Sequence, residues 1–122
     1  MKSYYALGMI ETVGLTSLIA AADEAIKTAD VRIILYEKPD AGIVTVYLVG
    51  DVAAVREAVS AGAQKAKELG EYRSSHVIPR LDKNVFSHLT ANSLKKKDRK
   101  RTVKQAYTEK EIERNHDQGS EQ

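Results

Sequence analysis

The sequence predicts an α+β domain over residues 1–86, with the element order β-α-β-β-α-β of ferredoxin-like folds. Three observations predict it. Two longer stretches carry apolar residues at helical spacing, four short apolar or β-branched runs flank them, and the composition turns strongly polar after Phe86. We expect an antiparallel sheet with both helices on one face. Residues 87–122 are then a separate C-terminal extension.

The first strand and the first helix follow one another at the N-terminus. Residues 4–11, YYALGMIE, form a short apolar run that is typical of a buried strand, and TVG then turns the chain. In residues 15–29 the apolar side chains at 15, 18, 19, 22 and 26 share one helical face. We expect this face to lie on the sheet and Asp30 to end the helix.

The second and third strands are close together in the sequence. Residues 31–38, VRIILYEK, are rich in β-branched side chains. Residues 43–50, IVTVYLVG, alternate Val and Leu with Thr and Tyr, which is typical of a strand with one buried face. The stretch EKPDAGIV, residues 37–44, joins them and raises the question of whether it is more than a turn.

The second helix is predicted over residues 52–70. Asp51 is a good N-cap, because its carboxylate can accept hydrogen bonds from the first turn. Gly70 is expected just after the C-terminal end. Gly62 in the helix interior costs about 1 kcal/mol relative to alanine, which indicates a close backbone approach to the sheet. Residues 71–80, EYRSSHVIPR, read as the last strand, which ends near a proline.

The charge of the chain is concentrated in its tail. Residues 1–86 carry 10 Lys and Arg against 11 Asp and Glu, whereas residues 87–122 carry 9 against 6. The basic run 95–101 lacks interleaved aromatic residues, so the sequence favours a solvated segment over a nucleic-acid site. We expect a flexible, disordered extension. Weak anchors for a transient helix are Val103, Tyr107 and Ile112.

The sequence contains no recognisable catalytic or metal site. There is no cysteine, the three histidines at 76, 88 and 116 stand far apart, and the glycines form no phosphate-binding pattern. No apolar run approaches the roughly 20 residues of a membrane span. We therefore predict a soluble, cytoplasmic protein without catalytic residues, metal or cofactor. For His76 in the last predicted strand we favour a structural or interface role.

Several stretches together resemble one family. ALGMIET (6–12), AADEAIKTADV (21–31), YEK (36–38), GDVAAVREAVSAGA (50–63) and HVIPR (76–80) are similar to the hexamer-forming shell proteins of bacterial microcompartments, the BMC domain family. No single motif is diagnostic, but their order and spacing match over most of residues 5–86. The resemblance implies the same β-α-β-β-α-β domain.

The resemblance also implies a structural protein and not an enzyme. Family members form flat cyclic homohexamers that tile, with other shell proteins, into the shell of a microcompartment in the cytoplasm. A small pore on the six-fold axis passes metabolites. By this resemblance the pore-lining residues of this chain are Lys38, Pro39, Asp40, Ala41 and Gly42.

The candidate pore loop departs from the family pattern in its chemistry. The family commonly has Lys-Ile-Gly-Ser-Gly here, whereas this chain has Lys38-Pro39-Asp40-Ala41-Gly42. Ala41 removes the usual hydroxyl, and Gly42 suits a positive φ. Six copies of Asp40 facing the axis would raise some carboxyl pKa values and favour cations. The alternative is that Asp40 caps its own turn.

Two further positions carry over to the hexamer edge. Lys27 matches a lysine that lies along its partner across a two-fold contact, and Arg80 matches an arginine that enters a pocket at the same edge. The extension 87–122 is a candidate for recruiting encapsulated enzymes. Two alternatives stay open, namely an oligomeric ferredoxin-like module that binds a small molecule, and a nucleic-acid binder that acts through the tail.

Overall fold

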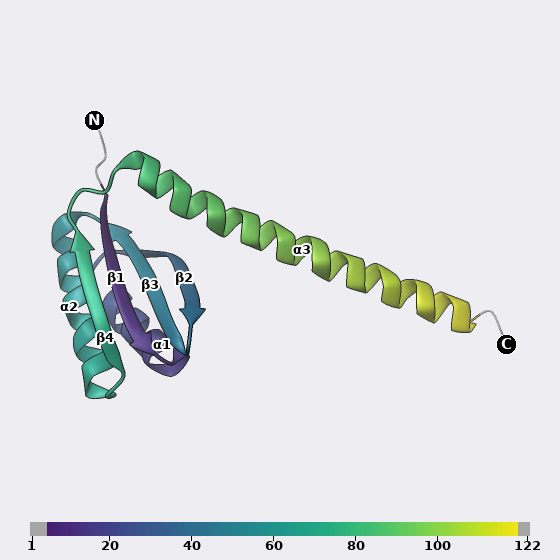
Figure 1. Ribbon diagram of the computed structural model, residues 1–122, viewed down its shortest axis with the longest axis horizontal. Helices are drawn as coiled ribbons and strands as arrows, with labels where there is room; N and C mark the ends of the chain where they lie inside the picture. The colour runs from purple at the N-terminus through teal and green to yellow at the C-terminus, as the bar shows by residue number, and fades with distance from the viewer. Residues whose placement is uncertain (1–4, 120–122) are drawn as a thin grey trace. The chain divides into compact units, whose positions relative to one another are not determined.

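Four strands and two helices, in the order β-α-β-β-α-β, occupy the first two thirds of the chain, and one long helix follows (Figure 1). The computed structural model describes residues 5–119, and the side chains of all of these except 35–40 and 92–104. The elements are β1 (Ala6–Val13), α1 (Leu15–Thr28), β2 (Arg32–Asp40), β3 (Ile43–Gly50), α2 (Val52–Glu68), β4 (Tyr72–Ile78) and α3 (Lys83–Gly119). The predicted α+β class is confirmed.

The four strands form one antiparallel sheet in the order β2-β3-β1-β4. In the middle of the sheet Glu11 of β1 stands opposite Thr45 of β3 on one side and Ser74 of β4 on the other. A register shift next to Glu11 places Arg73 as an extra residue in β4. The edge strand β2 has two further register shifts in its pairing with β3, one between Ile33 and Leu35 and one between Glu37 and Asp40. An edge strand tolerates such a shift because one side of its backbone forms no hydrogen bonds to a neighbouring strand.

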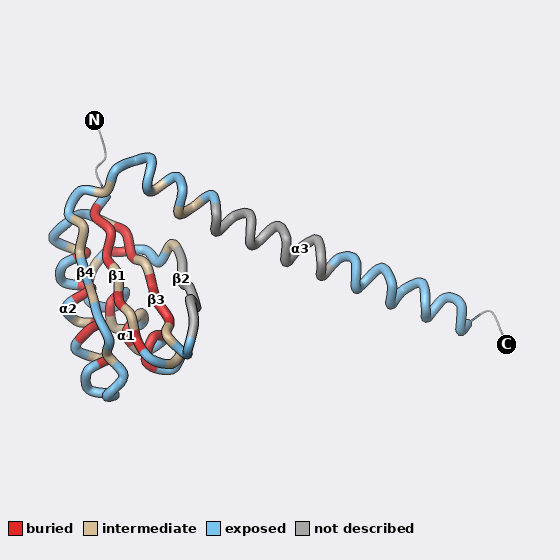
Figure 2. The backbone as a smooth tube through the Cα atoms, in the orientation of Figure 1, coloured by how far each residue is buried: buried red, intermediate tan, exposed pale blue. Residues whose placement is uncertain are grey.

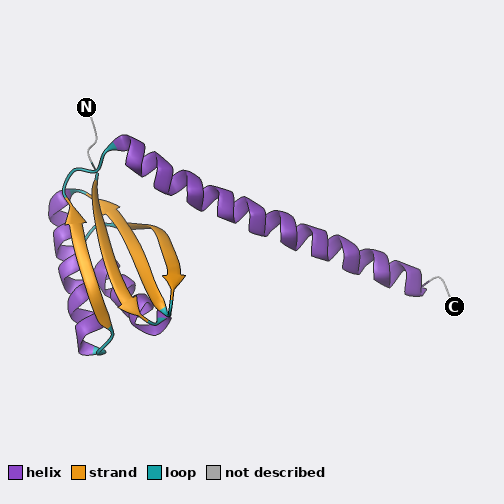
Figure 3. Cartoon of the chain, viewed as in Figure 1, coloured by secondary structure: helices purple, strands orange, loops and turns teal. Residues whose placement is uncertain are grey.

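Both α1 and α2 cover the same face of the sheet and pack against one another (Figures 1 and 3). Figure 2 shows the buried residues along β1, β3 and the inner sides of these helices. The core is aliphatic because β-branched strand residues meet alanine-rich helices, which lie close to the sheet. Its largest fully buried apolar side chains are Ile10, Val46, Leu48, Val49 and Val55.

Helix α2 has the ends that the sequence predicts. The Asp51 carboxylate accepts a hydrogen bond from the amide of Ala54 at 2.9 Å. At the other end Gly70 has a φ of 75°, its amide donates to Lys67, and the amide of Glu71 donates to Ala66. This pair of bonds is a Schellman motif, which satisfies carbonyl groups that the last turn would otherwise leave open.

Gly62 lies at the tightest contact of the two helices and the sheet. A Cβ atom there would stand 2.6 Å from Cδ1 of Ile10 on β1 and 2.7 Å from the carbonyl oxygen of Ala21 on α1. The predicted close approach is therefore confirmed, and it involves the backbone of α1 as well as the sheet. Gly8 of β1 is similar, since its Cβ would stand 2.5 Å from Val59 of α2.

The C-terminal segment differs from the flexible tail expected from the sequence. The chain divides into two compact units, Met1–Phe86 and Ser87–Gln122, and α3 runs through Gly119. Residues 83–118 contain neither proline nor glycine and are rich in Lys, Arg, Glu and Gln, all good helix formers. Every residue from 105 to 119 is exposed, so helix propensity and not burial supports this part of α3.

Candidate functional site

The β2–β3 hairpin contains the candidate pore loop. Asp40 pairs with Ile43, and the two residues between them, Ala41 and Gly42, have φ values of 54° and 77°. Two consecutive positive φ angles in a two-residue hairpin loop are typical of a type I′ turn, which suits the twist of the flanking strands. The positive φ predicted for Gly42 is confirmed. The strained conformation of Ala41 was not predicted, although a two-residue loop between strands would have indicated it.

The other candidate pore residues belong to the end of β2. Lys38, Pro39 and Asp40 continue the strand, and the register shift between Glu37 and Asp40 falls in the segment that contains the proline. Proline has no amide to donate, so an edge strand with a local irregularity is where it fits. The side chains of these three residues lie outside the described residues, and with them the predicted direction of the Asp40 carboxylate.

The tip of this hairpin is bonded to a turn elsewhere in the chain. The Gly42 carbonyl accepts a hydrogen bond of 2.8 Å from the amide of Gly14, which lies between β1 and α1. The Gly14 carbonyl in turn accepts from the hydroxyl of Thr12 at 3.0 Å. Both Ala41 and Gly42 are exposed to solvent. The hairpin therefore presents an exposed tip on a fixed backbone.

Lys27 stands in the last turn of α1 with its side chain in solvent. Its Nζ atom lies 2.7 Å from the Asp23 carboxylate, one helical turn earlier. The hydrogen bond that Lys27 donates to the Asp23 carboxylate, together with the charge of that carboxylate, raises the pKa of Lys27 above its ordinary value of 10.5. The ammonium group is thus charged and exposed, as a donor to another molecule has to be.

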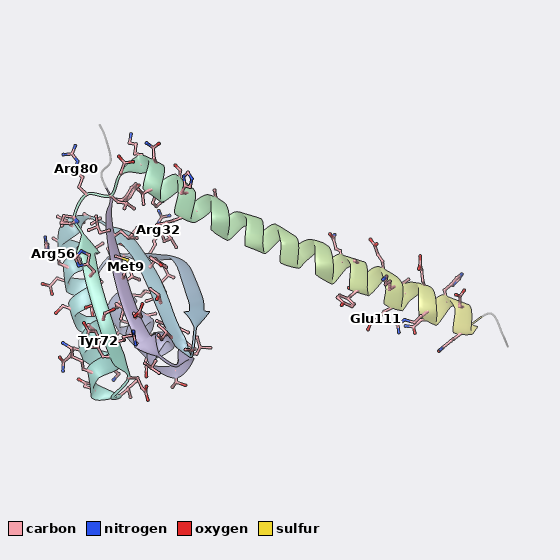
Figure 4. The ribbon with its side chains drawn as sticks, in the orientation of Figure 1. Met9, Arg32, Arg56, Tyr72, Arg80 and Glu111 are labelled. Atoms are coloured by element: carbon pink, nitrogen blue, oxygen red, sulfur yellow. The ribbon has the colours of Figure 1, made fainter. Side chains whose placement is uncertain are left out.

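Arg80 follows the last strand, two residues after β4 ends. It is exposed, and its side chain extends away from the sheet in Figure 4. Pro79 before it restricts the backbone at this point, which limits the directions that the chain can take after β4. The structure thus places both candidate edge residues on the surface but tests neither contact.

An apolar groove between α1 and the edge strand β2 was not predicted. It has a volume of about 300 Å³, and the side chains of Ile19 and Ile33 in it are 60% and 41% exposed. Its lining is entirely aliphatic, with Leu15, Leu18, Ile19, Ala22, Ile33 and Val46.

The groove also corrects one sequence-based expectation. The apolar positions of α1 were all expected to face the sheet, but only some do. Leu18 is buried, whereas Leu15, Ile19 and Ile26 are exposed. The apolar stripe of α1 is wider than the strip that one sheet can cover, so part of it faces outward.

The sheet face opposite the helices carries polar groups in its middle. Arg73 of β4 and Glu11 of β1 form an ion pair of 2.8 Å, and the Thr45 hydroxyl of β3 donates to Glu11 at 3.4 Å. His76 lies opposite Met9 in the same sheet and is exposed. These contacts link the three strands and satisfy a carboxylate that would otherwise lack a partner on the sheet.

The described residues offer no metal centre and no membrane span. Among the side chains with described positions, no three of His, Cys, Asp and Glu gather closely enough to hold an ion. No helix within residues 5–119 is long and apolar enough to cross a bilayer.

Comparison with known proteins identifies the family. A family model of the BMC domain matches residues 6–81, which is more than half of the chain. The chain belongs to the BMC domain family. The bacterial microcompartment shell protein PduA of Citrobacter freundii is 53% identical over 80 residues, which cover 66% of this chain and 86% of that protein. The shell protein EutM of Escherichia coli K12 is 48% identical over 75 residues, covering 62% and 77%.

Other BMC proteins show the same relationship. The carboxysome shell protein CcmK2 of Synechococcus elongatus is 45% identical over 82 residues, which cover 66% of this chain and 80% of that protein. A crystal structure of a microcompartment protein from Desulfitobacterium hafniense superposes with a TM-score of 0.62 at 38% identity. That match covers 70% of this chain and spans 48%, about half, of the other chain. The resemblance inferred from the sequence is confirmed.

Proposed function

We propose that this protein is a structural shell protein of a bacterial microcompartment, located in the shell within the bacterial cytoplasm, and not an enzyme. The observation that carries this proposal is the match of residues 6–81 to the BMC domain, together with shell proteins that are up to 53% identical. The strand order β2-β3-β1-β4, with both helices on one face, supports classing the domain as ferredoxin-like.

The assembled form would be a cyclic homohexamer that tiles with other shell proteins. The apolar groove between α1 and β2 supports self-association, because exposed aliphatic clusters of this kind usually mark a contact surface. Native mass spectrometry and electron microscopy of the purified full chain test this. We expect hexamers that grow into sheets or tubes, and a monomer at high concentration would contradict the proposal.

The pore of the hexamer would be lined by residues 38–42. The exposed tip at Ala41 and Gly42 supports this, since a loop that meets its copies on an axis has to project from the domain. Six copies of Asp40 around the axis would favour cations over anions. The matched variants Asp40→Asn and Asp40→Ala separate the charge from the size of the side chain. We expect both to raise anion permeation through assembled shells, and unchanged cation and anion permeation would contradict the charged ring.

Lys27 and Arg80 would make the contacts between neighbouring hexamers. Both are exposed, and the charged Lys27 ammonium group has further N–H donors besides the one that bonds Asp23. We expect Lys27→Ala to leave hexamers intact and to prevent sheets, as seen by electron microscopy. Lys65→Ala on α2 is a matched control, because that lysine also pairs with an acid one turn away. Normal sheets from the Lys27 variant would contradict the assignment.

The unit Ser87–Gln122 would recruit partners to one face of the shell. Its net charge of +3 and its exposed helical surface support binding of an acidic partner, such as an encapsulated enzyme. Co-sedimentation of acidic cargo with shells of the full chain, compared with shells that lack residues 87–122, tests this role. Equal recovery of cargo from both shells would contradict it.

A further inference from the structure

The turn between β1 and α1 is hydrogen-bonded to both neighbouring turns of the domain. The amide of Val13, the last residue of β1, donates to the carbonyl of Glu71 at 2.9 Å, in the turn just before β4. The amide of Gly14 donates to the carbonyl of Gly42 at 2.8 Å, at the tip of the β2–β3 hairpin. The hairpin tip is therefore held by a main-chain bond from outside its own two strands.

Gly14 makes this bond from a backbone conformation that other residues rarely adopt. Its φ is 94° and its ψ is 147°, a region that is essentially restricted to glycine. A Cβ atom at Gly14 would meet nothing within 4 Å, so the requirement for glycine is conformational and not steric. The conformation is thus required by the path of the chain, and it is the one from which the amide reaches Gly42.

Thr12 holds the carbonyl group of Gly14. Its side chain is fully buried, and its hydroxyl donates to the Gly14 carbonyl at 3.0 Å. A buried hydroxyl needs a hydrogen-bond partner, so this bond also contributes to satisfying Thr12. Both the amide and the carbonyl of Gly14 are therefore held.

The hairpin has a physical need for such a support. A type I′ turn is most favourable with Asn-Gly, Asp-Gly or Gly-Gly, because both central residues have positive φ. Here the first of them is Ala41, whose Cβ disfavours its φ of 54°. The turn is consequently less stable by itself than an Asn-Gly turn. A hydrogen bond from outside the hairpin therefore contributes more to holding its conformation.

We propose that Thr12 and Gly14 are positioning residues that fix the tip of the β2–β3 hairpin, and thereby set the width of the pore. The inference rests on the pore proposed above. In a six-fold ring each displacement of the hairpin tip is repeated in every subunit. A small movement of the tip therefore changes the width of the whole pore. A site of this kind needs its residues held by bonded neighbours on rigid elements, as Gly42 is through Gly14.

The variants Gly14→Ala and Gly70→Ala test the support as a matched pair. Both glycines have positive φ and open space around a Cβ, so each substitution introduces backbone strain without a steric clash. Only Gly14 is bonded to the hairpin tip. Hydrogen–deuterium exchange of residues 37–46 in the full-length, assembled protein is the measurement. We expect exchange to become about three- to tenfold faster in Gly14→Ala and to stay unchanged in Gly70→Ala.

A second pair of variants tests the same support if Gly14→Ala does not fold. Thr12→Val keeps the shape of a buried side chain and removes its hydroxyl. Thr45→Val makes the same change at a second buried threonine, which donates to Glu11 instead. Because Thr45 itself lies in β3, this comparison uses the exchange of residues 40–43 at the tip. We expect faster exchange there only in Thr12→Val. Equal exchange of the hairpin within each pair would overturn the inference.

Permeation of glycerol through shells assembled from Thr12→Val distinguishes the positioning role of Thr12 from the proposal that residues 38–42 line the pore. We expect the rate to differ at least about twofold from that of the unchanged chain, because the tip is less constrained. Faster hairpin exchange with unchanged permeation would support the positioning role and would contradict a pore at residues 38–42. Unchanged exchange would overturn the positioning role whatever the permeation.

Discussion

Gly62 lies where α2 meets both β1 and α1, and a methyl group there has no space. The Cβ of Gly62→Ala would stand 2.7 Å from a backbone carbonyl oxygen, which cannot rotate away as a side chain could. Overpacking outweighs the gain of about 1 kcal/mol in helix propensity, so we expect a net loss of about 1–2 kcal/mol in the free energy of unfolding.

Denaturant unfolding of Gly62→Ala measures this loss. Ser60→Ala on the exposed side of the same helix is the control, since it raises helix propensity without a close contact and should stabilise slightly. A Gly62→Ala variant as stable as Ser60→Ala would show that the helices can separate at no cost.

The pair of Asp23 and Lys27 gives a prediction about protonation. A lysine whose pKa is raised in the folded protein contributes stability at pH values below its ordinary value of 10.5 and loses it as the pH rises through the higher, folded value. Asp23→Asn removes the charge and weakens the hydrogen bond, so the pKa of Lys27 should fall towards 10.5. Nuclear magnetic resonance titration of the Lys27 side chain measures it, and an unchanged pKa would exclude Asp23 as the cause.

Single residues differ in how far the sequence predicts them. Asp51, Gly62 and Gly70 were predictable because each need is local, namely a cap, a missing Cβ and a left-handed helix end. Gly14 was not, because its backbone conformation depends on a hydrogen bond between distant turns. Such bonds leave no pattern in one sequence. Ala41 was missed because β2 was expected to end at residue 38 and ends at Asp40, which leaves a loop of two residues.

At the scale of elements, α3 is the clearest case of a helix without a core. All residues from 105 to 119 are exposed, so nothing in the described structure buries this part. Deleting residues 87–122 should leave the thermal unfolding midpoint of the domain within a few degrees of the full chain, while the far-ultraviolet circular dichroism loses its share of helix. A large fall of the midpoint would show that the helix stabilises the domain.

The element boundaries show where sequence periodicity is reliable. The third strand has the predicted bounds, Ile43–Gly50, because it alternates and ends at a glycine. The first strand was expected at 4–11 and lies at Ala6–Val13. A continuous apolar run has no alternation that would mark where the strand begins and ends. For α3 the residues indicated a transient helix at most, because a helix that is polar all round has no apolar stripe to reveal it.

At the scale of the whole molecule, the groove of α1 and β2 links the fold to assembly. Ile19→Asp places a charge among aliphatic side chains that would be buried in a hexamer, so we expect smaller species at concentrations where the unchanged chain is assembled. Thr16→Asp on the same helix, exposed and outside the groove, is the control. Size-exclusion chromatography with light scattering distinguishes them, and equal masses for both variants would remove the groove from the interface.

The sequence predicted the domain well and its outward-facing surface poorly. The resemblance over most of residues 5–86 predicted the family, and the family model confirms it at 6–81. The groove escaped prediction because periodicity marks an apolar face without saying whether the same chain covers it. Leu15, Ile19 and Ile26 look like core residues in the sequence and are exposed in the single chain.

The unbroken course of α3 has a consequence for engineering. A continuous helix of 37 residues is about 55 Å long. Each inserted residue lengthens it by about 1.5 Å and rotates everything after it by about 100° about the helix axis. A protein fused after Gly119 would therefore be rotated by about 200° through a two-residue insertion, whereas about seven inserted residues return it to nearly its original azimuth. Insertions of this kind therefore set the distance and the rotation of a fused protein relative to the axis of the helix itself.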